Sequence, residues 1–251
     1  ILVVGPTGSG KTTTLYAALS EVDTTEKNVL TIEDPVEYSI GGISQVQVNA
    51  KKGLTFATGL RAFLRQDPDV MMVGEIRDLE TAEVAIRAAL TGHLVFSTVH
   101  TNDAPSTVTR LVDQGVEPYL VSSSIVLVIA QRLVRTICKH CRVLVPLSEE
   151  WAAKCKKLGI KPGDVDQQIA YGTGCDECFN SGYAGRTAIY EFMPMTEPVR
   201  TLVMEGGNAT QLKKKAVEGG MVSLRADGID KIRQRLTTPD EVLRVTQLDL
   251  G

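Results

Sequence analysis

One eight-residue run, Gly5-Pro6-Thr7-Gly8-Ser9-Gly10-Lys11-Thr12, restricts the possible folds of this chain more than any other feature. It follows the apolar segment 1–4 and precedes a helical pattern over 11–19. The order strand, G-x-x-x-x-G-K-[ST], helix is the setting of a P-loop. Its glycines let backbone N–H groups converge on phosphate oxygens, and the helix adds its positive end. The expected phosphate-binding residues are Gly5, Pro6, Thr7, Gly8, Ser9, Gly10, Lys11, Thr12 and Thr13.

Two side chains of this run have separate expected roles. Lys11 should reach the β- and γ-phosphates of a nucleoside triphosphate, and the Thr12 hydroxyl should bind Mg²⁺. The alternative is a chance glycine-rich turn, which is disfavoured because strand, motif and helix stand in register. The sequence therefore predicts a P-loop domain that binds ATP together with Mg²⁺.

The first half of the chain alternates short apolar segments with amphipathic ones. This pattern predicts an α/β fold in which helices flank a predominantly parallel sheet. A hairpin is expected after the second strand, turned at Gly41-Gly42. We assign residues 1–134 to this nucleotide-binding core. Its predicted strands are 1–4, 29–32, 70–73 and 94–99, and its predicted helices are 11–19, 54–64, 78–90, 106–113 and 118–130.

Acidic residues follow two of the predicted strands, at the edge where open α/β sheets collect their ligands. Attack of water on a terminal phosphate needs a group that orients or deprotonates that water. Glu33 and Glu37 lie in one cluster, and Glu75 follows a fully apolar strand. Because Gly74 stands where an Asp commonly precedes the Glu, Mg²⁺ must rely on Thr12, phosphate oxygens and water. We rank the candidate bases Glu37, Glu75 and Glu33, with solvated surface acids as the alternative.

The predicted strand 94–99 lies between two histidines. His93 precedes it, and a lone histidine is more often structural than functional. His100 follows the strand among hydroxyl side chains, at the edge where the ligand is expected. We therefore take His100 as a candidate sensor of the γ-phosphate and His93 as structural.

Four of the five cysteines form two C-x-x-C pairs. Each pair presents two sulfur atoms to one metal ion, and four thiolates suit tetrahedral Zn²⁺. The 33 residues between the pairs exceed the usual zinc-ribbon spacing, but an intervening loop costs little entropy. A redox pair and metal-free thiols are the alternatives. Four thiolates leave no open coordination position, so we expect a structural site whose ligands are Cys138, Cys141, Cys175 and Cys178.

The rest of the chain surrounds and follows these pairs. Residues 135–186 are rich in glycine and polar side chains, and we assign them to a small zinc-binding module. Cys155 falls on a predicted helix and is expected to be an ordinary thiol, while His140 is a spare ligand that we do not adopt. Residues 187–251 begin with a strand-like alternation and then have a helical pattern. Their last helix opens with the capping-box pattern of 238–241.

Charge and hydropathy limit the possible partners. The net charge of −3 gives no general attraction to nucleic acid or to anionic lipid. No apolar run approaches the roughly 20 residues of a membrane-spanning helix. The chain opens on an apolar segment without an initiator Met or the features of a signal peptide, so we expect it to be a piece of a longer protein.

Several motifs occur together in an order that resembles a known family. They are the P-loop 5–12, the Asp box 31–37, the segment 59–78, the His box 92–102, and the tetracysteine insertion followed by Gly182-Tyr183-Ala184-Gly185-Arg186. Over essentially its whole length the chain is similar to the ATPases of type II secretion and type IV pilus assembly (GspE/PilB-like). The tetracysteine insertion distinguishes this branch from the pilus-retraction ATPases, which lack it.

The resemblance implies a RecA-like P-loop ATPase that assembles into a hexameric ring at the cytoplasmic face of the bacterial inner membrane. There it would drive pilus or pseudopilus extension through an inner-membrane platform protein and an adaptor. It implies neither a nucleic-acid partner nor a membrane-spanning segment. In the family a preceding domain supplies arginines to the nucleotide. Within this chain Arg61, Arg65 and Arg77 are candidates for phosphate or subunit contacts, with surface solvation or local ion pairs as the alternative.

Three other classes share part of this pattern. A GTPase should carry an Asn-Lys-x-Asp base reader, which the sequence lacks. A DNA translocase needs a basic binding face, and the run Lys213-Lys214-Lys215 is too short to form one. A nucleotide-binding interaction module without turnover stays open as an alternative.

Overall fold

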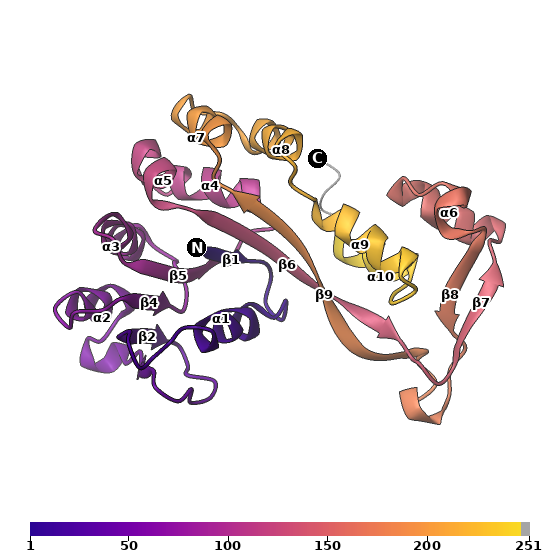
Figure 1. Ribbon diagram of the computed structural model, residues 1–251, viewed down its shortest axis with the longest axis horizontal. Helices are drawn as coiled ribbons and strands as arrows, with labels where there is room; N and C mark the ends of the chain where they lie inside the picture. Colours follow the sequence, from indigo (N-terminus) through magenta and orange to yellow (C-terminus); the bar gives the residue numbers. More distant parts are fainter. Residues whose placement is uncertain (247–251) are drawn as a thin grey trace. The chain divides into compact units, whose positions relative to one another are not determined.

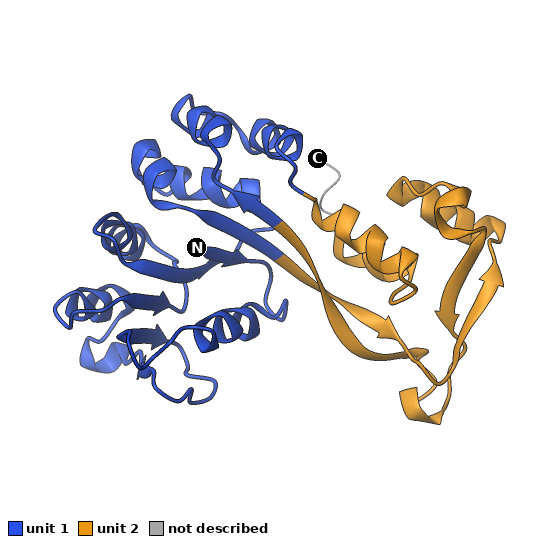
Figure 2. Cartoon of the chain, viewed as in Figure 1, with its two compact units in different colours: residues 1–130, 192–221 blue, residues 131–191, 222–251 orange. Residues whose placement is uncertain are grey.

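A computed structural model describes residues 1–246 and divides the chain into two compact units (Figure 2). Unit 1 contains Ile1–Ala130 and Phe192–Met221. Unit 2 contains Gln131–Glu191 together with the chain from Val222 onward. Each unit is therefore built from two separate stretches of sequence.

Unit 1 is organised around a mixed, mostly parallel sheet (Figure 1). The strand order is β3-β2-β4-β5-β1-β6-β9, and each neighbouring pair from β3 to β6 is parallel. The arrow of β9 runs opposite to that of β6 in Figure 1. The predicted, predominantly parallel sheet is thus confirmed. Its strands are β1 (Leu2–Val4), β2 (Val29–Glu33), β3 (Ser44–Gln47), β4 (Val70–Val73), β5 (Leu94–Val99), β6 (Leu127–Ile137) and β9 (Tyr183–Pro194).

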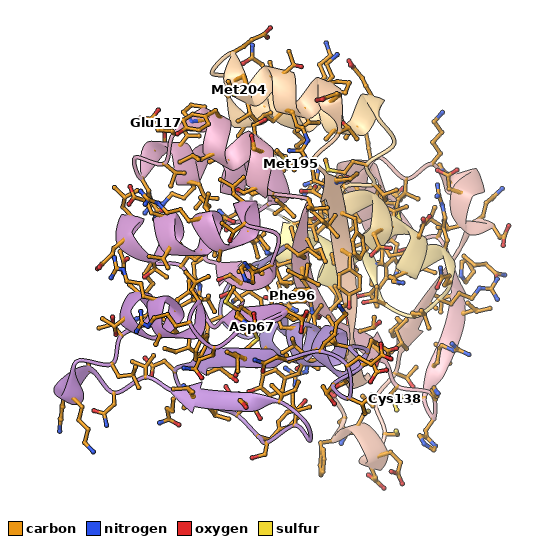
Figure 3. All side chains as sticks on the ribbon, turned by 60° about the vertical axis from the view of Figure 1, so that its left-hand side comes forward. Asp67, Phe96, Glu117, Cys138, Met195 and Met204 are labelled. Atoms are coloured by element: carbon orange, nitrogen blue, oxygen red, sulfur yellow. The ribbon has the colours of Figure 1, made fainter. Side chains whose placement is uncertain are left out.

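Helices cover both faces of this sheet because its central strands are apolar on both sides. On one face Met72 and Phe96, the latter labelled in Figure 3, form a core with Leu15 of the first helix. On the other face a Cβ at Gly59 would overlap the end of the Ile32 side chain, which would have to move to admit a larger residue. The helices of unit 1 are α1 (Lys11–Ser20), η1 (Ala50–Lys52), α2 (Phe56–Phe63), α3 (Leu79–Leu90), α4 (Ala104–Asp113), α5 (Pro118–Ser124), α7 (Glu197–Met204) and α8 (Ala209–Glu218).

Two sequence predictions about unit 1 are wrong. β3 pairs with β2 in parallel, so the turn at Gly41-Gly42 does not make a hairpin. The helix expected over 118–130 ends at Ser124, and β6 begins at Leu127 and pairs with β1. The run Ile125-Val126-Leu127-Val128-Ile129 is rich in β-branched residues, which favour a strand. Its apolar character alone does not separate a strand from a buried helix.

Unit 2 contains a two-stranded antiparallel sheet, the continuations of β6 and β9, and three α-helices. Cys155, Leu158, Ile169, Ile232 and Val242 form its core. As predicted, Cys155 lies in a helix, and its thiol is buried among apolar side chains. The elements of unit 2 are β7 (Arg142–Pro146), α6 (Glu149–Leu158), η2 (Pro162–Val165), β8 (Gln168–Gly172), η3 (Asp176–Cys178), α9 (Leu224–Arg233) and α10 (Pro239–Thr246).

A buried carboxylate ties α10 to β6 within unit 2. The side chain of Glu241 is 1% exposed. It accepts hydrogen bonds from the backbone N–H of Arg135 at 2.9 Å, from the Arg135 guanidinium at 2.7 Å and from the Arg244 guanidinium at 2.8 and 3.0 Å. Burial opposes ionisation, but these donors outweigh it and lower the pKa of Glu241 to about 2. The predicted capping box is half formed, because the Thr238 hydroxyl accepts from the Glu241 N–H while the carboxylate binds the arginines.

All helices of the described part of the chain are short. The longest among residues 1–246 is α3, with 12 residues. A helix that crosses a bilayer needs about 20 apolar residues. Within the described residues no helix has the length and apolar character for such a crossing.

Candidate functional site

The P-loop run forms the turn between β1 and α1. Gly5, Gly8 and Gly10 have φ values of 148°, 79° and 88°, which glycine adopts without strain. Gly10 is the N-cap of α1, and no side chain caps this end of the helix. By contrast, Asp78 and Asp103 cap the N-termini of α3 and α4. An anion can therefore take the place of the missing cap at the start of α1.

The side chains of the run lie close to this turn. Lys11 Nζ donates to the carbonyl oxygen of Gly5 at 2.9 Å and to that of Pro6 at 3.1 Å, so the ammonium group rests on the loop itself. The Ser9 side chain is buried, and its hydroxyl has no hydrogen-bond partner in the protein. A buried hydroxyl without a partner is costly, and a bound ligand would supply one. The other predicted side chains of the run, those of Thr7, Thr12 and Thr13, are exposed.

The register of the parallel strands brings the predicted site residues to one edge of the sheet. Val4 of β1 pairs with Val99 of β5, and Val73 of β4 pairs with Ile32 of β2. β4 and β5 are themselves neighbours. The residues that follow these four strand ends lie along the carboxyl edge of the sheet, where open α/β folds bind their ligands. They include Gly5, His100 and Glu75, and Glu33 is itself the last residue of β2.

Close packing explains why glycine precedes Glu75. The N–H of Gly74 donates to Ile32 O at 2.8 Å. A Cβ at position 74 would lie 3.3 Å from that oxygen, 3.3 Å from the Phe56 ring and 3.4 Å from the Cα of Glu33. A side chain at this place would require these neighbours to shift by a few tenths of an ångström. The close approach of β2 and β4 therefore disfavours the usual Asp at position 74.

Two side chains, those of Arg77 and His100, lie beside the Glu75 carboxylate. The Glu75 side chain is 10% exposed. Arg77 forms an ion pair with Glu75 Oε1, and this contact raises the pKa of Arg77. His100 Nε2 lies 3.2 Å from Glu75 Oε2. The structure thus joins two predicted site residues, Glu75 and His100, and adds Arg77 to them.

Glu33, the last residue of β2, and Glu37, in the loop that follows, have different surroundings. Glu33 is 3% exposed, and its carboxylate accepts hydrogen bonds from the hydroxyl groups of Tyr16 and Thr31 and from Gln45 Nε2. Glu37 is exposed, and its backbone N–H donates to the Tyr16 hydroxyl at 3.2 Å. The Glu33 carboxylate therefore points into the body of unit 1, whereas that of Glu37 is open to solvent.

The remaining candidates make local contacts. Arg61 pairs with Glu80 at 2.7 Å, and Arg65 donates to the carbonyl oxygen of Arg61 at 3.0 Å. His93 Nδ1 lies 2.9 Å from Ala88 O and 3.0 Å from Thr91 Oγ1 at the end of α3. These contacts agree with the structural role expected for His93. For Arg61 the contact matches the local ion-pair alternative, whereas that of Arg65 is a hydrogen bond to a backbone carbonyl oxygen.

The four cysteines predicted as ligands lie together in unit 2. Their Sγ atoms are all within 4.8 Å of one another. The Sγ–Sγ distances are 3.9 Å for Cys138 and Cys175, 3.8 Å for Cys141 and Cys178, and 3.7 Å for Cys175 and Cys178. Four sulfur atoms at about 2.3 Å from a central Zn²⁺ would be roughly 3.8 Å apart. None of these cysteines forms a disulfide, so the set fits a tetrahedral zinc ion.

Backbone groups support this sulfur cluster. The N–H groups of Cys175 and Gly182 each donate to Cys178 Sγ at 3.3 Å. Burial acts to raise the pKa of Cys178, but these donors prevail and lower it to about 6. Gly182 also crosses Gly172 so closely that a Cβ on either residue would overlap the backbone of the other. The glycines therefore permit the close chain crossing beside the cluster.

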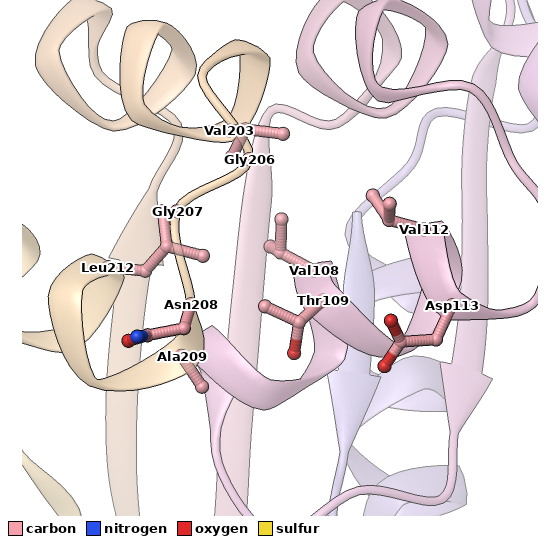
Figure 4. A pocket seen from close by; sticks show the side chains of 10 residues that line it. All are labelled: Val108, Thr109, Val112, Asp113, Val203, Gly206, Gly207, Asn208, Ala209 and Leu212. Carbon is pink, nitrogen blue, oxygen red and sulfur yellow. The ribbon is translucent and has the colours of Figure 1, made fainter.

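A separate cavity of about 340 Å³ lies between α4 and the turn joining α7 to α8 (Figure 4). Val108 and Leu212 contribute apolar walls, and Asp113 and Asn208 add polar groups. The Asn208 side chain already accepts from the N–H of Gln211 as the cap of α8. No predicted site residue lines this cavity. It is therefore distinct from the sheet-edge site.

The sequence analysis did not single out Tyr16 or Gln45. Tyr16 follows Leu15 on the apolar side of α1, a position that suggests a core residue only. Yet a buried tyrosine hydroxyl needs a hydrogen-bond partner, and this requirement could have drawn attention to it. Nothing in the sequence around Gln45 indicates its contacts with Glu33 and with Tyr38 and Ile40 in the loop after β2.

Similarity to known proteins covers nearly the whole chain. Residues 1–244 match the family described as "Type II/IV secretion system protein". The chain is 51% identical over 249 residues to the type II secretion system protein E of Aeromonas hydrophila, covering 99% of this chain and 49% of that protein. It is 50% identical over 250 residues to the type IV pilus assembly ATPase PilB of Myxococcus xanthus, covering 99% and 44%. The chain spans about half the length of the curated relatives it matches.

Solved structures agree with this assignment. The pilus retraction motor PilT with bound ADP superposes with a TM-score of 0.69 and 30% identity, over 97% of this chain and 60% of that one. The ATPase DotB of Legionella pneumophila gives a TM-score of 0.69 at 28% identity, over 98% and 59%. The predicted fold class and the family resemblance are both confirmed. The chain belongs to the family of type II/IV secretion system proteins.

Proposed function

We propose that this chain is the ATP-hydrolysing part of a motor that powers type II protein secretion or type IV pilus assembly. The P-loop carries the proposal. A glycine turn, a helix start without a side-chain cap and the Lys11 ammonium group together form a site for a polyphosphate. Relatives named as a type II secretion system ATPase and a type IV pilus assembly ATPase match this chain over nearly its full length.

The residues of the sheet edge have distinct parts in this proposal. Lys11 and the loop N–H groups bind the β- and γ-phosphates of ATP. Bound Mg²⁺ would offset the charge on the phosphate oxygens, with the Thr12 hydroxyl as its protein ligand. Glu37, exposed in the loop after β2, takes the proton of the attacking water. The Glu33 carboxylate already accepts three hydrogen bonds within the protein, which supports placing Glu33 last among the three candidate bases.

Glu75 and His100 form a second element of the same site. Glu75 would hold water of a bound Mg²⁺ in place, since Gly74 offers no side-chain ligand in front of it. His100 lies 3.2 Å from the Glu75 carboxylate and senses the γ-phosphate. Loss of that phosphate on hydrolysis changes the charge next to this pair. The pair can thereby report the state of the nucleotide to β5.

We further propose that the motor is a hexameric ring at the cytoplasmic face of the inner membrane. Its partners are an inner-membrane platform protein and an adaptor. Residues 1–134 form the ATPase core, 135–186 the zinc-binding module and 187–251 the C-terminal part of the ATPase domain, whose last positions lie outside the described residues. Zn²⁺ held by the four cysteines stabilises the module without taking part in hydrolysis.

Nucleotide binding and turnover test the proposal. We expect Mg²⁺-dependent ATP binding and slow hydrolysis that DNA does not stimulate. Lys11→Ala should weaken ATP binding about 10- to 100-fold, because a hydrogen bond to a charged group contributes roughly 1.5–3 kcal/mol. Glu37→Gln should bind ATP normally and lose hydrolysis. Lys52→Ala, which removes a lysine from exposed η1, is the control and should bind and hydrolyse ATP as the unmodified chain does.

Three results would contradict the proposal in different ways. Absence of ATP binding would overturn its central statement. ATP binding without any turnover would favour the nucleotide-binding module. Stimulation of turnover by DNA would favour a translocase.

A further inference from the structure

The Tyr16 hydroxyl connects two parts of the candidate site that are far apart in sequence. Tyr16 lies on α1, the helix that starts at Lys11, and its side chain is 1% exposed. Its O–H donates to Glu33 Oε2, and its oxygen accepts from the Glu37 N–H at 3.2 Å. Burial, together with the Glu33 carboxylate, raises the pKa of Tyr16 to about 12, so the hydroxyl keeps its proton at neutral pH. The hydrogen bonds therefore run in one direction, from Glu37 through Tyr16 to Glu33.

Glu33 is the fixed end of this chain of hydrogen bonds. Its carboxylate has three donors, Tyr16, Thr31 and Gln45, and almost no contact with solvent. Such an acceptor holds its donors strongly, since hydrogen bonds to a charged group exceed those between neutral groups. It also lies at the end of β2, a fully buried strand that pairs with β3 on one side and β4 on the other. The position of the Tyr16 hydroxyl is thus set by the sheet.

Gln45 fastens the same loop at two further points. Its Nε2 donates to Tyr38 O at 3.2 Å, and its Oε1 accepts from the Ile40 N–H at 2.8 Å. The Tyr38 ring meets the Tyr16 ring edge-on, with centroids 4.7 Å apart and planes at 79°. The loop after β2 has no helix or strand of its own. These contacts, made to α1 and β3, therefore give it a defined position.

We propose that Tyr16 is a positioning residue for ATP hydrolysis, holding the Glu37 loop in register with the P-loop helix. This inference rests on the proposed function. Lys11 and Tyr16 belong to one helix, so the group that binds phosphate and the hydroxyl that holds Glu37 move as one body. A base displaced by about 1 Å can lose roughly 100-fold in rate. Tyr16 does not touch the substrate and acts through Glu37.

The first test compares two tyrosine-to-phenylalanine variants. Tyr16→Phe removes the hydroxyl and keeps the ring in the core and against Tyr38. We expect kcat to fall about 10- to 100-fold, while the ATP dissociation constant changes by less than about twofold. The matched control is Tyr171→Phe, which alters a half-buried tyrosine of unit 2 and should leave both values unchanged. A Tyr16→Phe variant with unmodified kcat would overturn the proposal.

The second test asks whether Tyr16 acts through Glu37. If it does, combining Tyr16→Phe with Glu37→Gln should give a variant no slower than Glu37→Gln alone. Additive losses would show that Tyr16 does not act through Glu37. Gln45→Ala removes the contacts to Tyr38 O and the Ile40 N–H, and with them the donors from Gln45 Nε2 to Glu33 and to the Tyr16 hydroxyl. It leaves α1 itself unchanged and should also lower kcat at constant ATP affinity. Gln45→Ala is the alternative variant if Tyr16→Phe folds poorly. An unchanged kcat would contradict the role of Gln45 in holding the loop after β2 in position.

Amide hydrogen exchange separates this inference from the proposed function. The Glu37 N–H should exchange slowly in the unmodified chain and faster in Tyr16→Phe, because its acceptor is lost. Unchanged exchange would overturn the role of Tyr16 whether or not the chain hydrolyses ATP. Conversely, an unmodified chain that binds no ATP would refute the proposed function, and the exchange comparison would still decide whether Tyr16 holds the loop.

Discussion

Replacing Glu241 with Gln should destabilise unit 2, and the loss should depend on pH. A carboxyl group whose pKa falls from its ordinary 4.5 to about 2 gains stability on folding. At about 1.4 kcal/mol per pH unit, this difference corresponds to roughly 3 kcal/mol. Its partners Arg135 and Arg244 are 49% and 54% exposed, so water screens part of the interaction. We therefore expect Glu241→Gln to cost about 2 kcal/mol at pH 7.

The sign of the pH dependence follows from the direction of this shift. The folded-state pKa of Glu241 lies below the unfolded-state value, so the stabilisation is complete above about pH 4.5 and is lost as the pH falls toward 2. The free energy of unfolding of the unmodified chain should fall in that window. The difference between it and Glu241→Gln should shrink over the same window.

The fluorescence of Trp151 can follow the unfolding of unit 2. Trp151 is the single tryptophan, and it packs against the unit 2 core that contains Val242 of α10. Urea unfolding of the unmodified chain and of Glu241→Gln is followed by Trp151 fluorescence at pH 7 and near pH 3. It gives the difference between their free energies of unfolding at each pH. Asp240→Asn, on the exposed side of the same helix turn, is the control and should cost less than about 1 kcal/mol. An equal difference at both pH values, or none at pH 7, would refute the reasoning.

Two further predictions concern the metal cluster and a helix cap. Gly172→Ala should lower the zinc content of the purified chain, because its Cβ would overlap Gly182; full zinc occupancy measured by elemental analysis would contradict the close crossing. Asp78→Ala should lower the free energy of unfolding by about 1 kcal/mol, because the carboxylate accepts from the Thr81 N–H at the start of α3. Glu26→Ala, which removes a carboxylate from an exposed turn, serves as the control. Equal unfolding midpoints for both variants would argue against the cap.

Features that depend on neighbouring residues were predicted well from the sequence. The strands 70–73 and 94–99 have the predicted bounds, because continuous apolar runs mark buried parallel strands. The four cysteines meet as expected, since each C-x-x-C pair already places two sulfurs together. The order of strands along the chain also put Glu75 and His100 at one edge.

Features that depend on distant packing were not predicted. The glycines Gly41-Gly42 predict a turn but do not determine the direction in which the next strand pairs. β3 pairs with β2 in parallel, although a hairpin was expected. β6 was mistaken for a helix because the run from Ile125 is apolar at every position. The Tyr16 hydroxyl forms hydrogen bonds to residues of β2 and of the loop after it, which are distant from Tyr16 in the sequence. Local pattern therefore identified the reactive groups but not the contacts that orient them.

The division of the chain into two units falls inside strands. β6 passes from unit 1 to unit 2 between Ala130 and Gln131, and β9 returns between Glu191 and Phe192. The two strands are hydrogen-bonded neighbours. A gene fragment truncated at either position would end in the middle of a strand and expose unpaired backbone edges, which favour aggregation. Dissection of this protein by truncation or limited proteolysis therefore has no linker to use at these two positions, and point substitution is the cleaner way to separate the roles of its units.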